Sequence, residues 1–202
     1  MLVNKFLENL FSAPSNVSVL RVLNERVIGI TGRETARLTN LTHRTALKTL
    51  TSLEELGIVV RITGGRDHLF TLNRQKVISQ KIIHLIFEEE KNFSLNIIST
   101  LKKHLSKLTE SIIIYGSVAR KEELISSDYD ICIVYTKHLS KIENVVSKIR
   151  DQLNEQYSIQ IAPIYISGSE FKKRARKKLP PVNTIIKEGN VITGKSIHEL
   201  IK

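Results

Sequence analysis

Two short motifs, Gly116-Ser117 and Asp128-Tyr129-Asp130, restrict what this 202-residue chain can fold into more than any other feature. Each motif adjoins an apolar run with the composition of a buried strand, residues 111–115 before the first and 131–135 after the second. Gly116 lets a phosphate approach the backbone, and Ser117 begins a helical segment whose free N–H groups attract anions. The sequence therefore predicts a phosphate-binding turn close to paired acids.

The paired acids are suited to a divalent cation. Asp128 and Asp130 are two residues apart in an extended segment, so both carboxylates leave the same face. Carboxylates placed in this way repel each other unless a cation or hydrogen-bond donors satisfy them. Mg²⁺ would satisfy both and offset the charge of nucleotide phosphates. We therefore predict that Asp128 and Asp130 are metal ligands and catalytic residues, and that Tyr129 between them faces the core.

The order strand, Gly-Ser, helical turn, Ser-Asp-x-Asp, strand resembles the DNA polymerase β-like nucleotidyltransferase superfamily, above all its small minimal nucleotidyltransferases. The resemblance covers residues 110–196 and implies a small mixed sheet flanked by helices. It implies ATP or another NTP as ligand or substrate and Mg²⁺ as cofactor. The nucleotide-binding residues that it implies are Gly116, Ser117, Arg120 and Ser127. Arg120 could instead cap the end of its own helix, and the residues alone do not decide between these roles.

The resemblance also implies a third carboxylate on a later strand, which would help to bind the metal and activate the attacking hydroxyl. We expect that strand at residues 157–165, after a helix over 140–156, and it contains no acid. Gln160 is the candidate for the equivalent position, but an amide is neither a base nor a ligand that matches a carboxylate. Nucleotide and Mg²⁺ binding can survive the loss of this carboxylate, but the sequence does not decide whether catalysis does.

A different pattern occupies residues 1–73. Apolar residues at helical spacing over 16–25 predict a first helix. A short helix capped by Thr31 follows, and then a longer helix that is capped by Thr42 and ends at Gly57. Two β-rich runs then flank Gly64-Gly65-Arg66, which predicts a hairpin. This order of elements resembles a winged helix-turn-helix domain of prokaryotic regulators.

In such domains the recognition helix places its N-terminal residues in the major groove of DNA. Arg61 and Arg66 on the hairpin would reach phosphates or the minor groove. A net charge of +11 favours a polyanionic partner such as DNA. The alternative is a docking or dimerisation module whose polar face is simply solvated. The predicted groove-facing residues are Thr42, His43, Arg44, Thr45 and Lys48.

Residues 74–108 are predicted to form a helical connector of two helices with a break near Phe93. Their apolar stripes could pack on a neighbouring domain or on a second subunit, and regulators of this build are usually homodimers. The first stripe is Ile78, Ile82, Leu85 and Ile86, and the second is Ile97, Ile98, Leu101, Leu105 and Leu108. The chain is therefore predicted as α+β, with domains at 1–73, 74–108 and 109–202.

Other features limit the location and partners. No apolar run approaches the roughly 18–20 residues that a membrane span requires, and the N-terminus lacks the pattern of a signal peptide. The single cysteine, Cys132, cannot form an internal disulfide and is predicted to be a buried hydrophobic residue. We therefore expect a cytoplasmic protein without a membrane partner.

The densest basic run, residues 171–178, has two interpretations. It can be a solvated helix face, as such runs often are, or it can line the approach of a nucleotide or nucleic acid. Because it follows the strand next to the predicted site, the second interpretation is favoured.

Three functions are compatible with these patterns. The favoured one is a DNA-binding regulator whose nucleotidyltransferase-like domain binds nucleotide and Mg²⁺. The alternative is an active nucleotidyltransferase that moves NMP from an NTP to a hydroxyl of a partner protein, an RNA end or a small molecule. In the third, both domains are docking modules and the acidic pair is vestigial.

Overall fold

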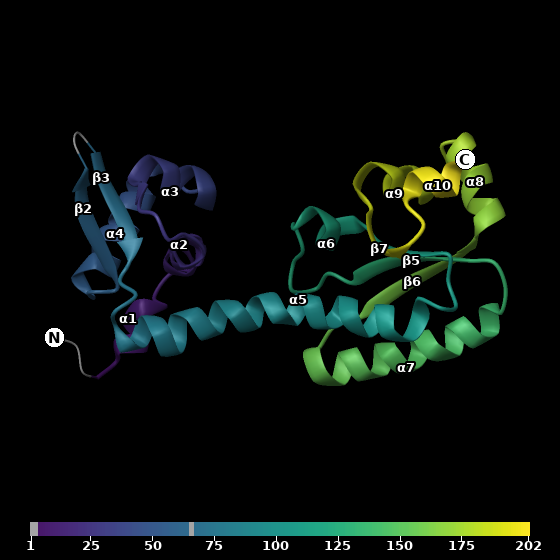
Figure 1. The fold of residues 1–202 in the computed structure, drawn as a ribbon, viewed down its shortest axis with the longest axis horizontal. Helices are drawn as coiled ribbons and strands as arrows, with labels where there is room; N and C mark the ends of the chain where they lie inside the picture. Colours follow the sequence, from purple (N-terminus) through teal and green to yellow (C-terminus); the bar gives the residue numbers. More distant parts are fainter. Residues whose placement is uncertain (1–3, 65–66) are drawn as a thin grey trace. The chain divides into compact units, whose positions relative to one another are not determined.

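The computed structural model describes residues 4–64 and 67–202. The chain divides into two compact units, Met1–Phe93 and Ser94–Lys202, and the boundary lies within the long helix α5 (His84–Leu105). Figure 1 gives the order of the elements along the chain, and each unit is described here by itself. Within the described ranges, no helix combines the length and the apolar character that a membrane span needs.

The first unit contains a cluster of helices and a small antiparallel sheet (Figure 1). The predicted hairpin is present as β2 (Val59–Gly64) and β3 (Asp67–Leu72), and β1 (Ile30–Thr31) completes a sheet in the order β1-β3-β2; the turn at Gly65-Arg66 lies outside the described residues. Both predicted helix caps form: the Thr31 and Thr42 hydroxyls accept hydrogen bonds from the N–H groups of Glu34 and Thr45. The elements are α1 Phe6–Leu10, α2 Pro14–Glu25, β1 Ile30–Thr31, α3 Gly32–Thr39, α4 His43–Glu55, β2 Val59–Gly64 and β3 Asp67–Leu72.

The connector differs from its prediction in two respects. Its predicted break near Phe93 is wrong, because α5 runs without interruption from His84 to Leu105. A π-helical turn, η1 (Ser79–Ile83), precedes α5 and is wider than an α-turn. The buried positions there are Ile83 and Phe87, while Leu85 and Ile86 of the predicted stripe are exposed in this chain, so their packing on a second subunit stays a prediction.

The second unit is built on a mixed four-stranded sheet in the order β6-β5-β4-β7. Strand β4 pairs with β5 and β7 in antiparallel fashion, whereas β5 and β6 are parallel. This confirms the predicted small mixed sheet flanked by helices. The elements are β4 Ser111–Ile114, α6 Gly116–Arg120, β5 Tyr129–Tyr135, α7 Leu139–Tyr157, β6 Ile161–Ser167, α8 Gly168–Arg176, α9 Val182–Glu188, β7 Asn190–Gly194 and α10 Ile197–Ile201.

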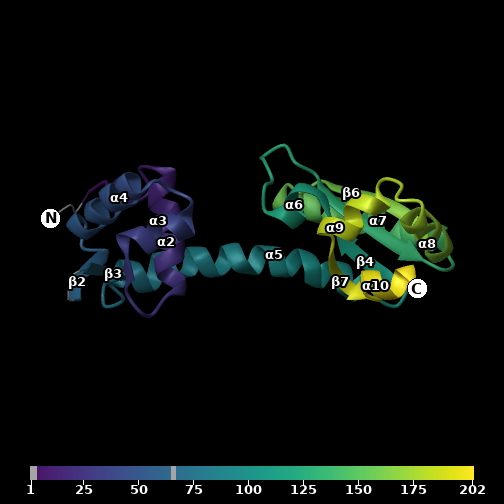
Figure 2. The same cartoon turned by 90° about the horizontal axis from the view of Figure 1, so that it is seen from above.

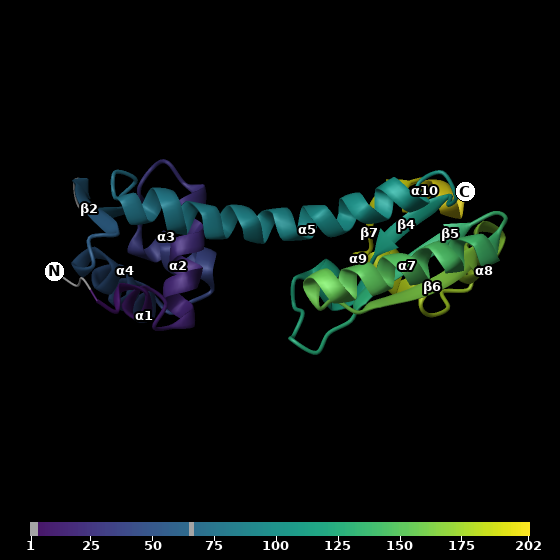
Figure 3. The ribbon, with the colours of Figure 1, turned by 90° about the horizontal axis from the view of Figure 1, so that it is seen from below.

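Helices cover both faces of this sheet (Figure 3). On one face, the C-terminal half of α5 and helix α7 pack Leu101 and Val146 against Ile131 and its neighbours. On the other face, α8, α9 and α10 bury Phe171 and the side chains around it. The sheet is thus the middle of three layers, and only its strand ends can present polar groups for chemistry.

Cys132 lies in the middle of β5 and is fully buried, as predicted. Burial raises the pKa of its thiol to about 12, because the thiolate is poorly solvated in an apolar core. This cysteine is therefore a core residue and has no part in the chemistry of the site.

Candidate functional site

The antiparallel pairing of β4 with β5 brings the two motifs together. Ile114 at the end of β4 pairs with Ile131 near the start of β5, and the Tyr115 N–H donates to the carbonyl of Asp130 at 3.1 Å. Gly116 therefore follows β4 at the place where Asp130 enters β5. Asp128 precedes β5 by one residue and is exposed, while Tyr129 is buried as predicted.

Gly116 and Asp130 are in direct contact. Gly116 has a φ of 76°, in the left-handed region that L-residues rarely adopt. A Cβ atom at this position would lie 2.3 Å from Oδ2 of Asp130, which is far inside van der Waals distance. The glycine thus allows both the turn and the close approach of the carboxylate.

The carboxylates of the site lie close enough to affect one another's ionisation. The pKa of Asp130 is raised, first because burial disfavours its charged form and then because Asp128 is nearby. Arg120 opposes this shift, and Glu188 adds to it. A bound cation would relieve the repulsion between the carboxylates.

Glu188 at the end of α9 is a site residue that sequence reasoning missed. Its Oε1 accepts hydrogen bonds from the Gly116 N–H at 2.9 Å and from Nη1 of Arg120 at 2.8 Å, and its Oε2 accepts from the same Nη1 at 2.8 Å. The Arg120 hydrogen bond, joined by that of Gly116, lowers the pKa of Glu188. Its separation from Gly116 by 72 residues left no local signal.

Arg120 therefore forms ion pairs with carboxylates. This role differs from both predicted ones, phosphate binding and capping of its own helix. Besides Glu188, it pairs through Nε with Oε2 of Glu122 at 2.8 Å. These two hydrogen bonds raise the pKa of the guanidinium.

The strand expected to carry a third acid begins later than predicted. Strand β6 starts at Ile161, and its parallel register with β5 pairs Asp130 with Ala162. Ala162, and not Gln160, is thus the residue beside Asp130. Gln160 is level with the exposed Asp128, and its carbonyl accepts the Tyr129 N–H at 2.8 Å. Neither residue is an acid, so the strand supplies no third carboxylate.

A cavity of about 250 Å³ adjoins the site. Asp128, Gln160 and Ala162 line it from the strand ends, and Arg150, Asp151 and Asn154 line it from α7. Asp151 is the other acid among its lining residues. Asp151 lies on a solvated face of α7, so nothing in the sequence indicated that it would line a cavity.

Two predicted nucleotide-binding serines differ in their surroundings. Ser117 follows Gly116 in α6 and is half-buried. The Ser127 hydroxyl accepts the N–H of Leu124 at 2.9 Å and so closes the loop before Asp128. Ser127 therefore stabilises the loop that leads to Asp128.

The basic run does not adjoin the site. It lies in and after α8, which begins where β6 ends, whereas Asp128 lies level with the start of β6 (Figure 1, Figure 2). A seven-residue strand is roughly 20 Å long, so the start of α8 lies at the far end of β6 from Asp128, and the interpretation of the run as lining the approach stays a prediction.

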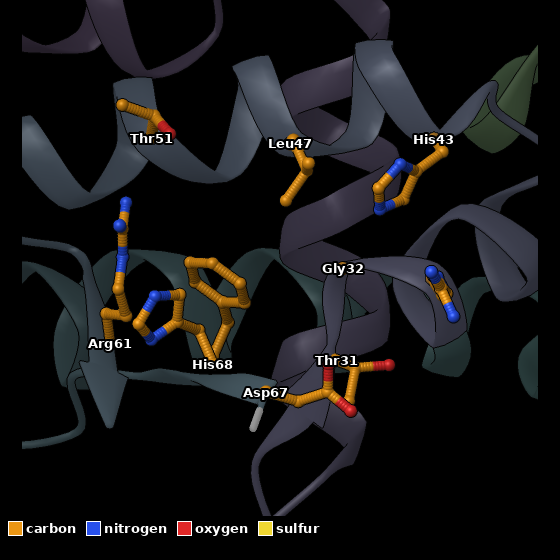
Figure 4. A pocket seen from close by; sticks show the side chains of 10 residues that line it. Thr31, Gly32, His43, Leu47, Thr51, Arg61, Asp67 and His68 are labelled. Carbon is orange, nitrogen blue, oxygen red and sulfur yellow. The ribbon is translucent and has the colours of Figure 1, made fainter. Parts of the chain in front are cut away.

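The predicted DNA-contacting residues of α4 are all exposed at its N-terminal end, and they are Thr42, His43, Arg44, Thr45 and Lys48. A cavity of about 380 Å³ lies between α4 and the hairpin. His43 extends from α4 on one side of it, and Arg61 and His68 extend from the hairpin on the other (Figure 4). Arg61 already pairs with Glu54 and lies over the Phe70 ring at 5.3 Å, while Arg66 lies outside the described residues.

The acidic pair fits Mg²⁺ by its donor chemistry. Among the described residues, no three His, Cys, Asp or Glu side chains form a group that could hold a metal ion. Mg²⁺ is usually held by one or two carboxylates together with substrate phosphates, and not by an all-protein cage. Two carboxylates close together beside the Gly116 turn are therefore a suitable set.

Part of the second unit matches a known family. Residues 95–182 match the family model of the nucleotidyltransferase domain. The nucleotidyltransferase resemblance drawn from the sequence is thereby confirmed for this part of the chain. The match does not extend to residues 1–94 or to Glu188, and it leaves the winged helix, the homodimer and the cytoplasmic location as predictions.

Among solved structures, a mutant of the toxin–antitoxin MntA-HpeT is similar at 14% identity and TM-score 0.38, covering 53% of this chain and 79% of that chain. A toxin–antitoxin with AMP-PNP is similar at 16% identity and TM-score 0.38, with the same 53% and 79% covered. No curated protein matches the chain.

Proposed function

We propose that this chain is a nucleotidyltransferase that moves NMP from an NTP, such as ATP, to a hydroxyl group. The observation that carries the proposal is the contact between Asp130 and Gly116, which joins the acidic pair to the phosphate-binding turn. The family match over residues 95–182 supports the same reaction class. The sequence alone favoured a DNA-binding regulator over an active transferase, and this proposal reverses that order.

The reaction would be an in-line displacement. The acceptor oxygen attacks the α-phosphorus, the bond from that phosphorus to the bridging oxygen breaks, and pyrophosphate leaves. Gly116 and Ser117 would hold phosphate oxygens, and Asp128 and Asp130 would hold Mg²⁺. When bound, the ion would neutralise the charge that develops on the phosphates.

Because Ala162 lies beside Asp130 and supplies no carboxylate, the proton of the attacking hydroxyl would pass to solvent.

The overall proposal is tested by incubating the protein with Mg²⁺, cell extract and ATP labelled at the α-phosphate. A macromolecule or small molecule in the extract should become labelled, and pyrophosphate should accumulate in step with it. Absence of both products under conditions where the protein is folded would refute the proposal.

A second candidate function is DNA binding by the first unit. Its support is the exposed set at the start of α4, together with an element order that suits a winged helix-turn-helix domain. Arg44 and Lys48 are cations of that set, and Arg61 is held by Glu54. Phosphate contacts would therefore depend more on α4 than on Arg61 of the hairpin.

The DNA-binding candidate predicts salt-dependent binding to fragments of the chain's own promoter. Arg44→Ala with Lys48→Ala should weaken binding at least about tenfold at low salt and flatten its salt dependence. Lys102→Ala with Lys103→Ala, at the end of α5, is the control. Fluorescence anisotropy that detects no binding by the unaltered protein at low salt would exclude this function.

A further inference from the structure

The carboxylate of Glu188 occupies two donors of the predicted nucleotide site. It accepts the Gly116 N–H and the Arg120 guanidinium together, at 2.8–2.9 Å. Carboxylate and phosphate oxygens use the same kinds of charged and backbone donors. A phosphate therefore cannot take the Gly116 N–H and Nη1 of Arg120 while Glu188 holds them.

Glu188 differs from the other acid on Arg120. Its side chain is 18% exposed and contacts Gly116, whereas the side chain of Glu122 is 66% exposed. Glu188 also lies among acids, since its charge acts on Asp130 along with that of Asp128. Glu188 is therefore held in place by its two donors, against the repulsion of the neighbouring carboxylates.

We propose that Glu188 occupies a phosphate subsite of the nucleotide site and that an incoming triphosphate displaces it from Gly116 and Arg120. The inference rests on the proposed nucleotidyltransferase function and adds a residue that lies outside the matched range of 95–182. Because one carboxylate holds both donors, its departure frees them together. Glu188 thus reduces the affinity of the site for every phosphate ligand and favours ligands of high negative charge.

The test compares the affinity of full-length variants for ATP with Mg²⁺ by titration calorimetry. Glu188→Gln keeps the shape of the side chain and removes the charge that competes with phosphate, so ATP should bind about tenfold more tightly. Glu122→Gln removes an equal charge from Arg120 without freeing Gly116, and its effect should stay within about twofold. Glu188→Asp, which is too short to keep both hydrogen bonds, should also bind ATP more tightly than the unaltered chain.

The outcomes separate this inference from the proposed function. Unchanged or weaker ATP affinity in both Glu188 variants, with binding by the unaltered chain intact, would overturn the displacement and leave the nucleotidyltransferase proposal standing. A tenfold gain in the Glu122 variant as well would also overturn it, because the effect would then be one of general charge. Absence of ATP binding in all variants would overturn both proposals.

Discussion

Replacement of Asp128 and Asp130 together by Asn is expected to reduce nucleotidyl transfer by at least about 10³-fold. Asn keeps the size of each side chain but removes the charge that would hold Mg²⁺ against the nucleotide phosphates. Folding should survive, because the pKa of Asp130 is raised by burial and by Asp128, which means that the ionised pair costs stability in the folded chain. The initial rate of label transfer and the midpoint of thermal unfolding measure the two effects.

The matched control for this double variant is Glu155→Gln on α7, which removes an exposed acid outside the motifs. It should transfer label at the rate of the unaltered chain. Equal rates for the double variant and the unaltered chain would exclude the acidic pair from the chemistry. A double variant that unfolds would instead assign the pair a structural role.

Gly116→Ala is the second change with a large expected effect. The new Cβ would meet Oδ2 of Asp130 at 2.3 Å, so either the turn or the carboxylate must move. The φ of 76° adds a cost of about 1 kcal/mol for any L-residue in this region. We expect ATP affinity to fall at least tenfold and the free energy of unfolding to fall by about 1–3 kcal/mol.

Gly57→Ala separates the two causes. Gly57 has nearly the same φ, 74°, but the nearest atom to its added Cβ is the Cε of Lys76 at 3.6 Å, an ordinary contact. This variant should lose stability by the backbone cost alone and should keep its ATP affinity. If Gly116→Ala bound ATP as tightly as Gly57→Ala, the close approach of Asp130 to the turn would have no role in binding.

Features that depend on neighbouring residues could be predicted from the sequence. Thr31 and Thr42 cap helices by accepting N–H groups that lie three residues ahead. Both partners are close in the chain, so the local sequence is enough to predict the cap. The Gly-Ser and Asp-x-Asp motifs were recognised for the same reason, since each lies beside its own strand. The nucleotidyltransferase resemblance, which the family match over residues 95–182 supports, followed from them.

Features that depend on pairing at a distance could not be predicted in this way. Ala162 lies beside Asp130 because β6 starts at Ile161, a register that the apolar run leaves open. Glu188 reaches Gly116 only because α9 packs against α6, and no residue near Glu188 indicates this contact. Asp151 becomes a lining residue only when α7 lies beside β6.

The connector shows how one local irregularity changes a pattern. A stripe with ordinary helical spacing grouped Ile82 with Leu85 and Ile86, but next to the π-helical turn at 79–83 the buried residues are Ile83 and Phe87. Periodicity cannot reveal such a turn, because it assumes a constant number of residues per turn.

The most direct test of the central claim is the position of the label that reaches the acceptor. The unaltered chain is incubated with Mg²⁺, cell extract and ATP that carries the label at either the α- or the γ-phosphate. Nucleotidyl transfer predicts an acceptor labelled from the α-position alone, with the γ-label recovered in pyrophosphate, and no labelling by the Asp128→Asn, Asp130→Asn variant. An acceptor labelled from the γ-position, or equal α-labelling by the double variant, would contradict it.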